Sequence, residues 1–189
     1  MGTNNMMNPQ HPSIDPMWSS GNYLFMDKVD EDSCKTAIRF IQYHNSMGRA
    51  ALDEIQITLN TPGGCVRSCF ALVDTMLTSK VPVNTAASGL IASCGVLLMM
   101  TGKKRVISQN CKVMSHQYSW GTAGKHSDLM AHRKAQDMAQ DMIMNHYRKC
   151  TKKTQKYIEK HLLPHEDVWM TPEEAVTHGI ADEVKDIYK

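Results

Sequence analysis

The sequence predicts a single-domain α/β protein, and two observations support this prediction. Strand-like segments, tight glycine turns and helical segments follow one another repeatedly, which is typical of α/β architectures rather than of helical bundles. The 189 residues, 42% of them apolar, are enough to bury one sizeable core and few for two domains. We therefore expect one globular domain over residues 22–189.

The first 21 residues are expected to form a flexible arm ahead of this domain. Asn, Met, Pro, Ser and Gly occur there without any period, and Pro9, Pro12 and Pro16 would interrupt a regular helix. The domain then begins with NYLFM at 22–26, a short predicted strand.

An amphipathic helix is predicted over residues 29–44. Asp30 and Asp32 are its candidate N-caps, since a side-chain carboxylate can accept hydrogen bonds from the first free N–H groups. The apolar positions that recur at helical spacing are Cys34, Ala37, Ile38 and Ile41.

The middle of the chain supplies two strand-to-helix units. EIQITLN at 54–60 alternates as a strand does, TPGG at 61–64 ends it, and a helical pattern runs from Val66 to Leu77. VPVNTAA at 81–87 is a second strand. We expect the following apolar run, SGLIASCGVLLMM, to be of helical length and to end at Thr101 and Gly102.

The last third of the chain predicts two short strands within 105–120 and a long helix over about 127–149. The predicted buried stripe of that helix consists of Ala131, Ala135, Met138 and Met142. TPEEAVTHG then carries every signal of a short capped helix: Thr171 as N-cap, Pro172 at N1, Glu174 at N3 and Gly179 just past the end.

Composition excludes several classes of protein. A net charge of +2 gives no field that would favour nucleic acid or an acidic membrane surface, and no run is long and apolar enough to span a bilayer. The six cysteines form no CxxC pair, which favours reduced thiols in a cytoplasmic protein. His161 and His165 have metal-ligand spacing on a helix, but Pro164 argues against one continuous helical face, so no metal site is expected.

Ser93 and Cys94 are adjacent candidate nucleophiles. Ser93 stands where a strand and loop give way to an apolar helix, so free backbone N–H groups would lie beside its hydroxyl and stabilise an oxyanion. The alternative is a serine that only caps the helix, and on this stretch alone that alternative is favoured. Cys94 is more typical of a small buried residue.

Two further segments could complete such a site. The glycines of TPGG allow backbone N–H groups to approach a ligand closely, although a plain strand-to-helix turn explains them equally. His116 follows an alternating strand and is a candidate general base. Spacing alone does not choose the acid that would orient it from among Asp128, Asp137, Asp141, Glu159, Glu166 and Asp167.

Taken together, the motifs resemble those of the proteolytic subunit of the ATP-dependent Clp protease, the ClpP family. ITLNTPGG, IASCGV, VMSHQ and EDVWMTPEEAVTHGIADEV occur in the family's order between about Tyr23 and Val184. The resemblance implies that Ser93 is the nucleophile, His116 the base and Asp167 the orienting acid. It also implies an oxyanion hole formed by Gly64 and the backbone N–H of Cys94.

The same resemblance implies the fold and the partners. The fold would be a crotonase-like spiral of ββα units with a long handle helix, assembled as two stacked heptameric rings, a tetradecamer, around the active sites. The activity would be serine endopeptidase cleavage of unfolded polypeptides without metal or cofactor. A Clp-type unfoldase ATPase would supply these substrates in a bacterial cytoplasm, or in the host cytoplasm for a phage-encoded chain.

Departures from the family pattern indicate a divergent member, in keeping with a phage-encoded or accessory paralogue. Cys94 replaces a bulky apolar residue, Tyr118 replaces a proline, and His165 with Glu166 replaces an acidic residue and an arginine. The family's opening hairpin and first helix have no clear match in residues 1–21. The alternatives are a catalytically idle ring subunit, a viral capsid-maturation protease and, least favoured, an acyl-CoA enzyme of the same fold.

Overall fold

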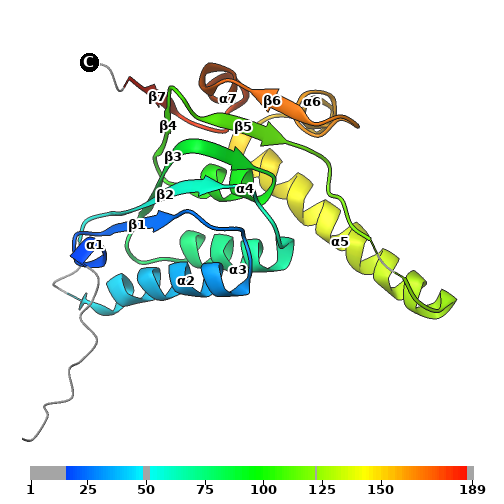
Figure 1. Ribbon diagram of the computed structural model, residues 1–189, viewed down its shortest axis with the longest axis horizontal. Helices are drawn as coiled ribbons and strands as arrows, with labels where there is room; N and C mark the ends of the chain where they lie inside the picture. Colours follow the sequence, from blue (N-terminus) through cyan, green and yellow to red (C-terminus); the bar gives the residue numbers. More distant parts are fainter. Residues whose placement is uncertain (1–15, 49–51, 122, 187–189) are drawn as a thin grey trace, which may run out of the picture.

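The computed structural model describes residues 16–48, 52–121 and 123–186, which form one α/β domain built on a seven-stranded sheet (Figure 1). The strands are β1 (Asn22–Phe25), β2 (Ile55–Thr61), β3 (Val83–Ala92), β4 (Arg105–Ser108), β5 (Lys112–Ser115), β6 (Val168–Met170) and β7 (Glu183–Lys185). The helices are α1 (Pro16–Ser19), α2 (Glu31–Ser46), α3 (Val66–Leu77), α4 (Cys94–Thr101), α5 (His126–Thr151), α6 (Gln155–His161) and α7 (Pro172–His178). The α/β prediction is confirmed.

The sheet branches at β3, the longest strand. Its first half pairs with β2 and β4, and its last residues, Leu90 to Ala92, pair with β5, while Ile91 also pairs with Thr61 of β2. All of these pairings are parallel, and only β5 and β6 run antiparallel. Because β3 leads directly into α4, the branch delivers the end of β3, the start of α4 and the end of β5 to one place.

Helices α2, α3 and α4 pack next to one another beside the sheet, and α5 packs on α4. The buried core between these layers includes Phe25, Phe40, Ile57, Leu72, Ile91 and Leu98. All eight residues of α4 are buried, which explains why its sequence has no polar face. The apolar run that follows Ser93 is therefore a helix buried in the core.

The predicted caps of α2 and α7 are confirmed. Asp30 caps α2 by accepting a hydrogen bond from the Ser33 N–H at 2.9 Å, and the Ser33 hydroxyl accepts one from the Asp30 N–H. Thr171 and Glu174 form the capping box of α7, and Gly179 ends that helix in the left-handed conformation.

Three expectations need correction. Residues 1–15 of the predicted arm lie outside the described residues, but α1 is folded onto the domain, with the Trp18 ring 5.7 Å from Phe40 and the Trp18 carbonyl 2.8 Å from His44 Nε2. Residues 88–92 continue strand β3 instead of starting the helix. An apolar strand that runs into an apolar helix offers no change of period by which to place the boundary.

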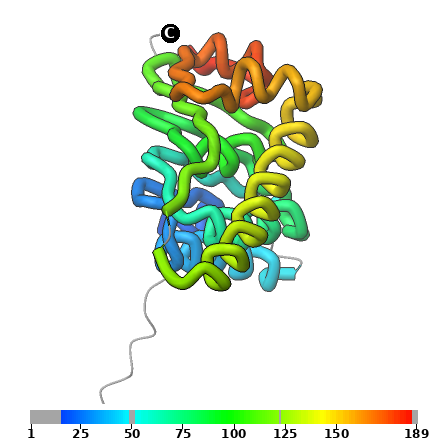
Figure 2. Tube along the Cα trace, turned by 90° about the vertical axis from the view of Figure 1, so that its right-hand side faces the viewer, coloured from blue at the N-terminus to red at the C-terminus, as the bar shows by residue number. Residues whose placement is uncertain are grey.

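The third correction concerns α5. Its expected buried stripe is exposed, and Met138 and Met142 retain 59% and 45% of their accessible surface. Figure 1 shows the N-terminal half of α5 extending beyond the sheet, and Figure 2 shows the helix running along the whole body. The helix is buried only towards its C-terminal end, where Ile143, His146 and Tyr147 contact the core.

Candidate active site

Ser93 lies in a strained turn between β3 and α4. Its φ of 54° and ψ of −120° are values that non-glycine residues rarely adopt, and its N–H donates to the Met114 carbonyl of β5 at 2.9 Å. Ser93 occupies the N-cap position of α4, yet its side chain makes no capping hydrogen bond. The reading of Ser93 as a capping serine is therefore wrong.

A glycine turn lies directly against Ser93. A Cβ atom added to Gly63 would come within 2.6 Å of the Ala92 carbonyl oxygen and 2.7 Å of Ser93 Cβ. Gly63 also has a φ of +87°, and its carbonyl accepts a hydrogen bond from the Val29 N–H at 2.9 Å. The close approach of the two turns thus requires glycine at position 63 on grounds of both space and conformation.

Gly64 is also held by close contact. It forms a bridge with Val29, and a side chain at position 64 would collide with the Val29 carbonyl. Gly64 and Ser93 line the same cavity. The structure therefore brings the predicted oxyanion residue Gly64 beside the predicted nucleophile.

The Cys94 thiol points away from solvent. Only 2% of Cys94 is exposed, and its Sγ donates to the Gly64 carbonyl at 3.2 Å. A hydrogen bond with Cys69 lowers the pKa of the Cys94 thiol and raises that of Cys69. As the first residue of α4, Cys94 has a backbone N–H without an acceptor inside the helix.

His116 follows β5 immediately and lines the same cavity as Ser93, Gly64 and Cys94. The cavity has a volume of about 80 Å³, and its remaining wall combines apolar side chains, Val66, Leu97 and Ile143, with polar ones, Gln117, Tyr118, Ser119 and Tyr147. None of the described residues that line it is Asp, Glu, Lys or Arg. In such surroundings, hydrogen bonds to a developing charge are stronger than they are in water.

Asp167 lies in the exposed loop before β6 and does not line this cavity. The antiparallel pairing of β5 with β6 ends at Ser115 and Val168, so the next residue of each segment, His116 and Asp167, follows at the same end of the ladder. Across the described part of the chain, no hydrogen bond joins Ser93 to His116 or His116 to Asp167. The structure thus brings Ser93, His116, Gly64 and Cys94 together in one cavity. Asp167 lies outside this cavity, one residue beyond the last β5–β6 pair, Ser115 and Val168.

Sequence reasoning missed Tyr147, which forms part of the cavity wall from helix α5. Its hydroxyl lies 2.7 Å from Ser115 Oγ, 32 residues earlier in the chain. A tyrosine among the apolar positions of a helix gives no signal of such a partner, because its sequence pattern is that of an ordinary core residue.

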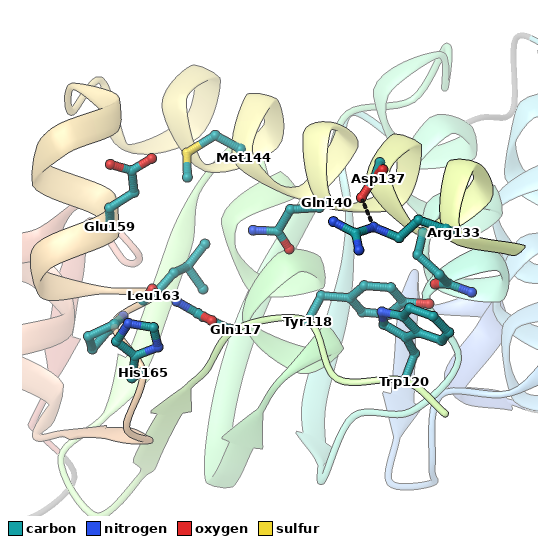
Figure 3. Close-up of a pocket in the computed structure, with 12 residues that line it drawn as sticks. Gln117, Tyr118, Trp120, Arg133, Asp137, Gln140, Met144, Glu159, Leu163 and His165 are labelled. Atoms are coloured by element: carbon teal, nitrogen blue, oxygen red, sulfur yellow. Dashed lines mark hydrogen bonds and ion pairs between the residues drawn. The ribbon is translucent and has the colours of Figure 1, made fainter. Parts of the chain in front are cut away.

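A larger cleft of about 630 Å³ adjoins the Ser93 cavity (Figure 3). Gln117 and Tyr118 line both spaces. Figure 3 shows Arg133 and Gln140 of α5 facing the rings of Tyr118 and Trp120 across this cleft, with Arg133 paired to Asp137. The two spaces are therefore neighbours, with Gln117 and Tyr118 as their common wall.

Among the residues described, no group of three or more His, Cys, Asp or Glu side chains is placed to hold a metal ion. No helix in the described ranges has the length and the apolar character needed to cross a membrane.

The fold and the site define a single-domain α/β protein with a serine and a histidine in one cavity beside a glycine turn. A sequence profile of the Clp protease family matches residues 14–187, and the chain belongs to this family. It is 36% identical over 135 residues to a protein of Deinococcus radiodurans named "ATP-dependent Clp protease proteolytic subunit". That alignment covers 70% of this chain and 65% of the relative, so the chain spans less than two thirds of the relative's length.

Proposed function

We propose that this protein is a serine endopeptidase and that Ser93 is its nucleophile. The observation that carries the proposal is the state of Ser93: it has a positive φ, it does not cap its helix, and it lies in one cavity with His116. A capping role would require neither the strain nor the histidine. Membership of the Clp protease family supports the same conclusion.

The reaction would be acyl transfer. His116 takes the Ser93 proton while Oγ attacks the peptide carbonyl, and the N–H groups of Gly64 and Cys94 stabilise the oxyanion. The C–N bond breaks as His116 protonates the leaving amine, and water then hydrolyses the acyl-enzyme. Asp167 orients the imidazole, a role that its position one register step beyond Ser115 and Val168 supports.

The assembly would be a pair of heptameric rings that enclose the Ser93 sites, fed with unfolded polypeptide by a Clp-type ATPase in the cytoplasm. Family membership supports self-assembly, and so does the exposed methionine face of α5, formed by Met130, Met138 and Met142. Such a face is unusual on an isolated helix and favours burial against another copy of the chain. Mass photometry should then give the mass of one or two rings of seven chains.

The decisive experiment uses a fluorophosphonate, which acylates activated serines. We expect the unmodified protein to be labelled at Ser93, and Ser93→Ala to lose both labelling and peptide cleavage, by at least about a thousandfold. Cys94→Ala is the matched control, since the neighbouring residue contributes its backbone N–H, which alanine retains.

Two outcomes would contradict the proposal. Labelling that persists in Ser93→Ala but vanishes in Cys94→Ala would transfer the nucleophile to the thiol. A folded, ring-forming protein that is neither labelled nor active would be the idle ring subunit.

A further inference from the structure

A buried chain of hydrogen bonds runs behind the candidate base. The Tyr147 hydroxyl lies 2.7 Å from Ser115 Oγ, which lies 2.6 Å from the carbonyl oxygen of Leu162. A carbonyl can only accept, so the Ser115 proton goes to Leu162 and the Tyr147 hydroxyl donates to Ser115. All three residues are at most 2% exposed. Without water to replace a lost partner, the chain has one favourable arrangement.

A second hydrogen bond runs parallel to this chain. Gln117 Nε2 donates to the carbonyl of Leu163 at 3.0 Å, and Figure 3 shows the two side chains next to each other. The residues immediately before and after His116 are thus attached to two consecutive carbonyls. His116 is the residue between these two attachment points.

The segment that receives both bonds is the one that leads to Asp167. Residues 162–167 connect α6 to β6, and β6 pairs with β5 up to Ser115 and Val168. The connection is therefore tied to the His116 segment at its start by Ser115 and Gln117, and at its end by strand pairing. These ties set the position of Asp167 relative to His116.

Tyr147 connects these hydrogen bonds to the cavity that Ser93 lines. Its ring forms part of the cavity wall beside Ser93, whereas its hydroxyl points to Ser115. Burial raises the pKa of Tyr147 well above its ordinary value, so the hydroxyl remains a donor at any working pH.

We propose that Ser115, Gln117 and Tyr147 are positioning residues that hold His116 in line with Asp167 and Ser93. The inference rests on the proposed function and adds to it the side chains through which the base is aligned. None of the three takes part in proton transfer, and each acts through His116.

The test is Tyr147→Phe, which deletes one hydroxyl and retains the ring in the cavity wall. We expect kcat for a fluorogenic peptide to fall about tenfold with KM within twofold, because alignment and not substrate contact is lost. Tyr157→Phe is the matched control. It also removes a phenol hydroxyl, one that contacts His178 Nδ1 at 3.0 Å. Tyr157 lines neither cavity described above, so this variant should retain full kcat.

A double-mutant comparison sharpens the test. If the hydrogen bonds act as one chain, Ser115→Ala with Tyr147→Phe should lose no more kcat than Ser115→Ala alone, whereas independent effects would multiply. Gln117→Met should lower kcat about threefold. Because Gln117 is exposed, this variant should fold, and it provides the test if a variant at a buried position does not fold.

Fluorophosphonate titration of active serines distinguishes the outcomes. Undiminished kcat per labelled serine in Tyr147→Phe and Gln117→Met would overturn the inference, as would a rate loss that only tracks the fraction of labelled protein. Absence of labelling in the unmodified protein would overturn the proposed function and this inference with it. If the unmodified protein is labelled normally and kcat is unchanged in Tyr147→Phe and Gln117→Met, the inference is overturned and the proposed function stands.

Discussion

The two sides of the candidate site are built in different ways. On the side of the proposed nucleophile, main-chain contacts fix the geometry. The turn at Gly63 lies against Ser93, and the Ser93 N–H donates to the Met114 carbonyl. On the side of the proposed acid, the side chains of Ser115 and Gln117 hold the carbonyls of the buried Leu162 and Leu163, from which the chain continues to the exposed Asp167. The proposed nucleophile therefore cannot be displaced without disturbing the core, whereas the proposed acid can change while the fold stays intact.

The largest effect is expected on the nucleophile side, for Gly63→Ala. The new methyl group would meet the Ala92 carbonyl and Ser93 Cβ, in a conformation that alanine disfavours. We expect the free energy of unfolding to drop by about 2–4 kcal/mol and peptidase activity to disappear. Urea unfolding and peptide cleavage measure the two losses.

Gly48→Ala is the control for this change. Gly48 also has a positive φ, at +57°, but a Cβ there would meet no atom of the described residues within 4 Å. Only the conformational cost, about 1 kcal/mol, should remain. Equal losses in the two variants would show that contact with Ser93 is not what makes position 63 sensitive.

The next effect is expected on the acid side, for Asp167→Asn. The residue is exposed and the change is nearly isosteric, so the free energy of unfolding should stay within about 0.5 kcal/mol. Cleavage should nevertheless fall at least a hundredfold, because the imidazole loses its orienting carboxylate. The neighbouring exposed substitution Glu166→Gln should leave cleavage unchanged; if it were the more damaging of the two, the acid would be misassigned.

The smallest effect concerns pH and the packing of α5 on the nucleophile side. His146 Nε2 donates to the Leu97 carbonyl of α4 at 3.0 Å, and burial lowers the pKa of His146 below its ordinary 6.5. The unfolded chain therefore takes up the proton first, and stability is lost as the pH falls below about 6.5, by at most about 1.4 kcal/mol per pH unit. Urea unfolding between pH 7 and pH 5 measures this slope.

The variant His146→Gln should flatten that slope, whereas His132→Gln, at an exposed position on the same helix, should retain it. Some dependence will persist because burial also lowers the pKa of His178. An unaltered slope in His146→Gln would show that this histidine does not couple the pH to the α4 and α5 contact.

Local signals predicted much of the fold. The caps at Asp30 and Thr171 and the glycine end at Gly179 depend on a few neighbouring residues, and the sequence displays all of them. The C-terminal end of α4 at Thr101 and Gly102 was also predictable, because the apolar run stops there, whereas its start was not, since the strand before it is equally apolar.

What the sequence could not predict depends on distant partners. Met138 has the spacing of a buried residue, but periodicity does not reveal whether the covering surface belongs to the same chain. Likewise, nothing near Tyr147 announces its hydrogen bond to Ser115. The roles of Ser93, His116 and Asp167 stay predictions until the labelling and mutation experiments are done.

With Ser93 as the proposed nucleophile, its positive φ would set catalytic ability against stability at a single position. Glycine would adopt this backbone without strain, so Ser93→Gly would relax the turn and simultaneously remove the nucleophile. Selection for robustness alone would therefore favour inactive versions of this chain. Any laboratory evolution for heat resistance would need a parallel screen for cleavage to retain the hydroxyl.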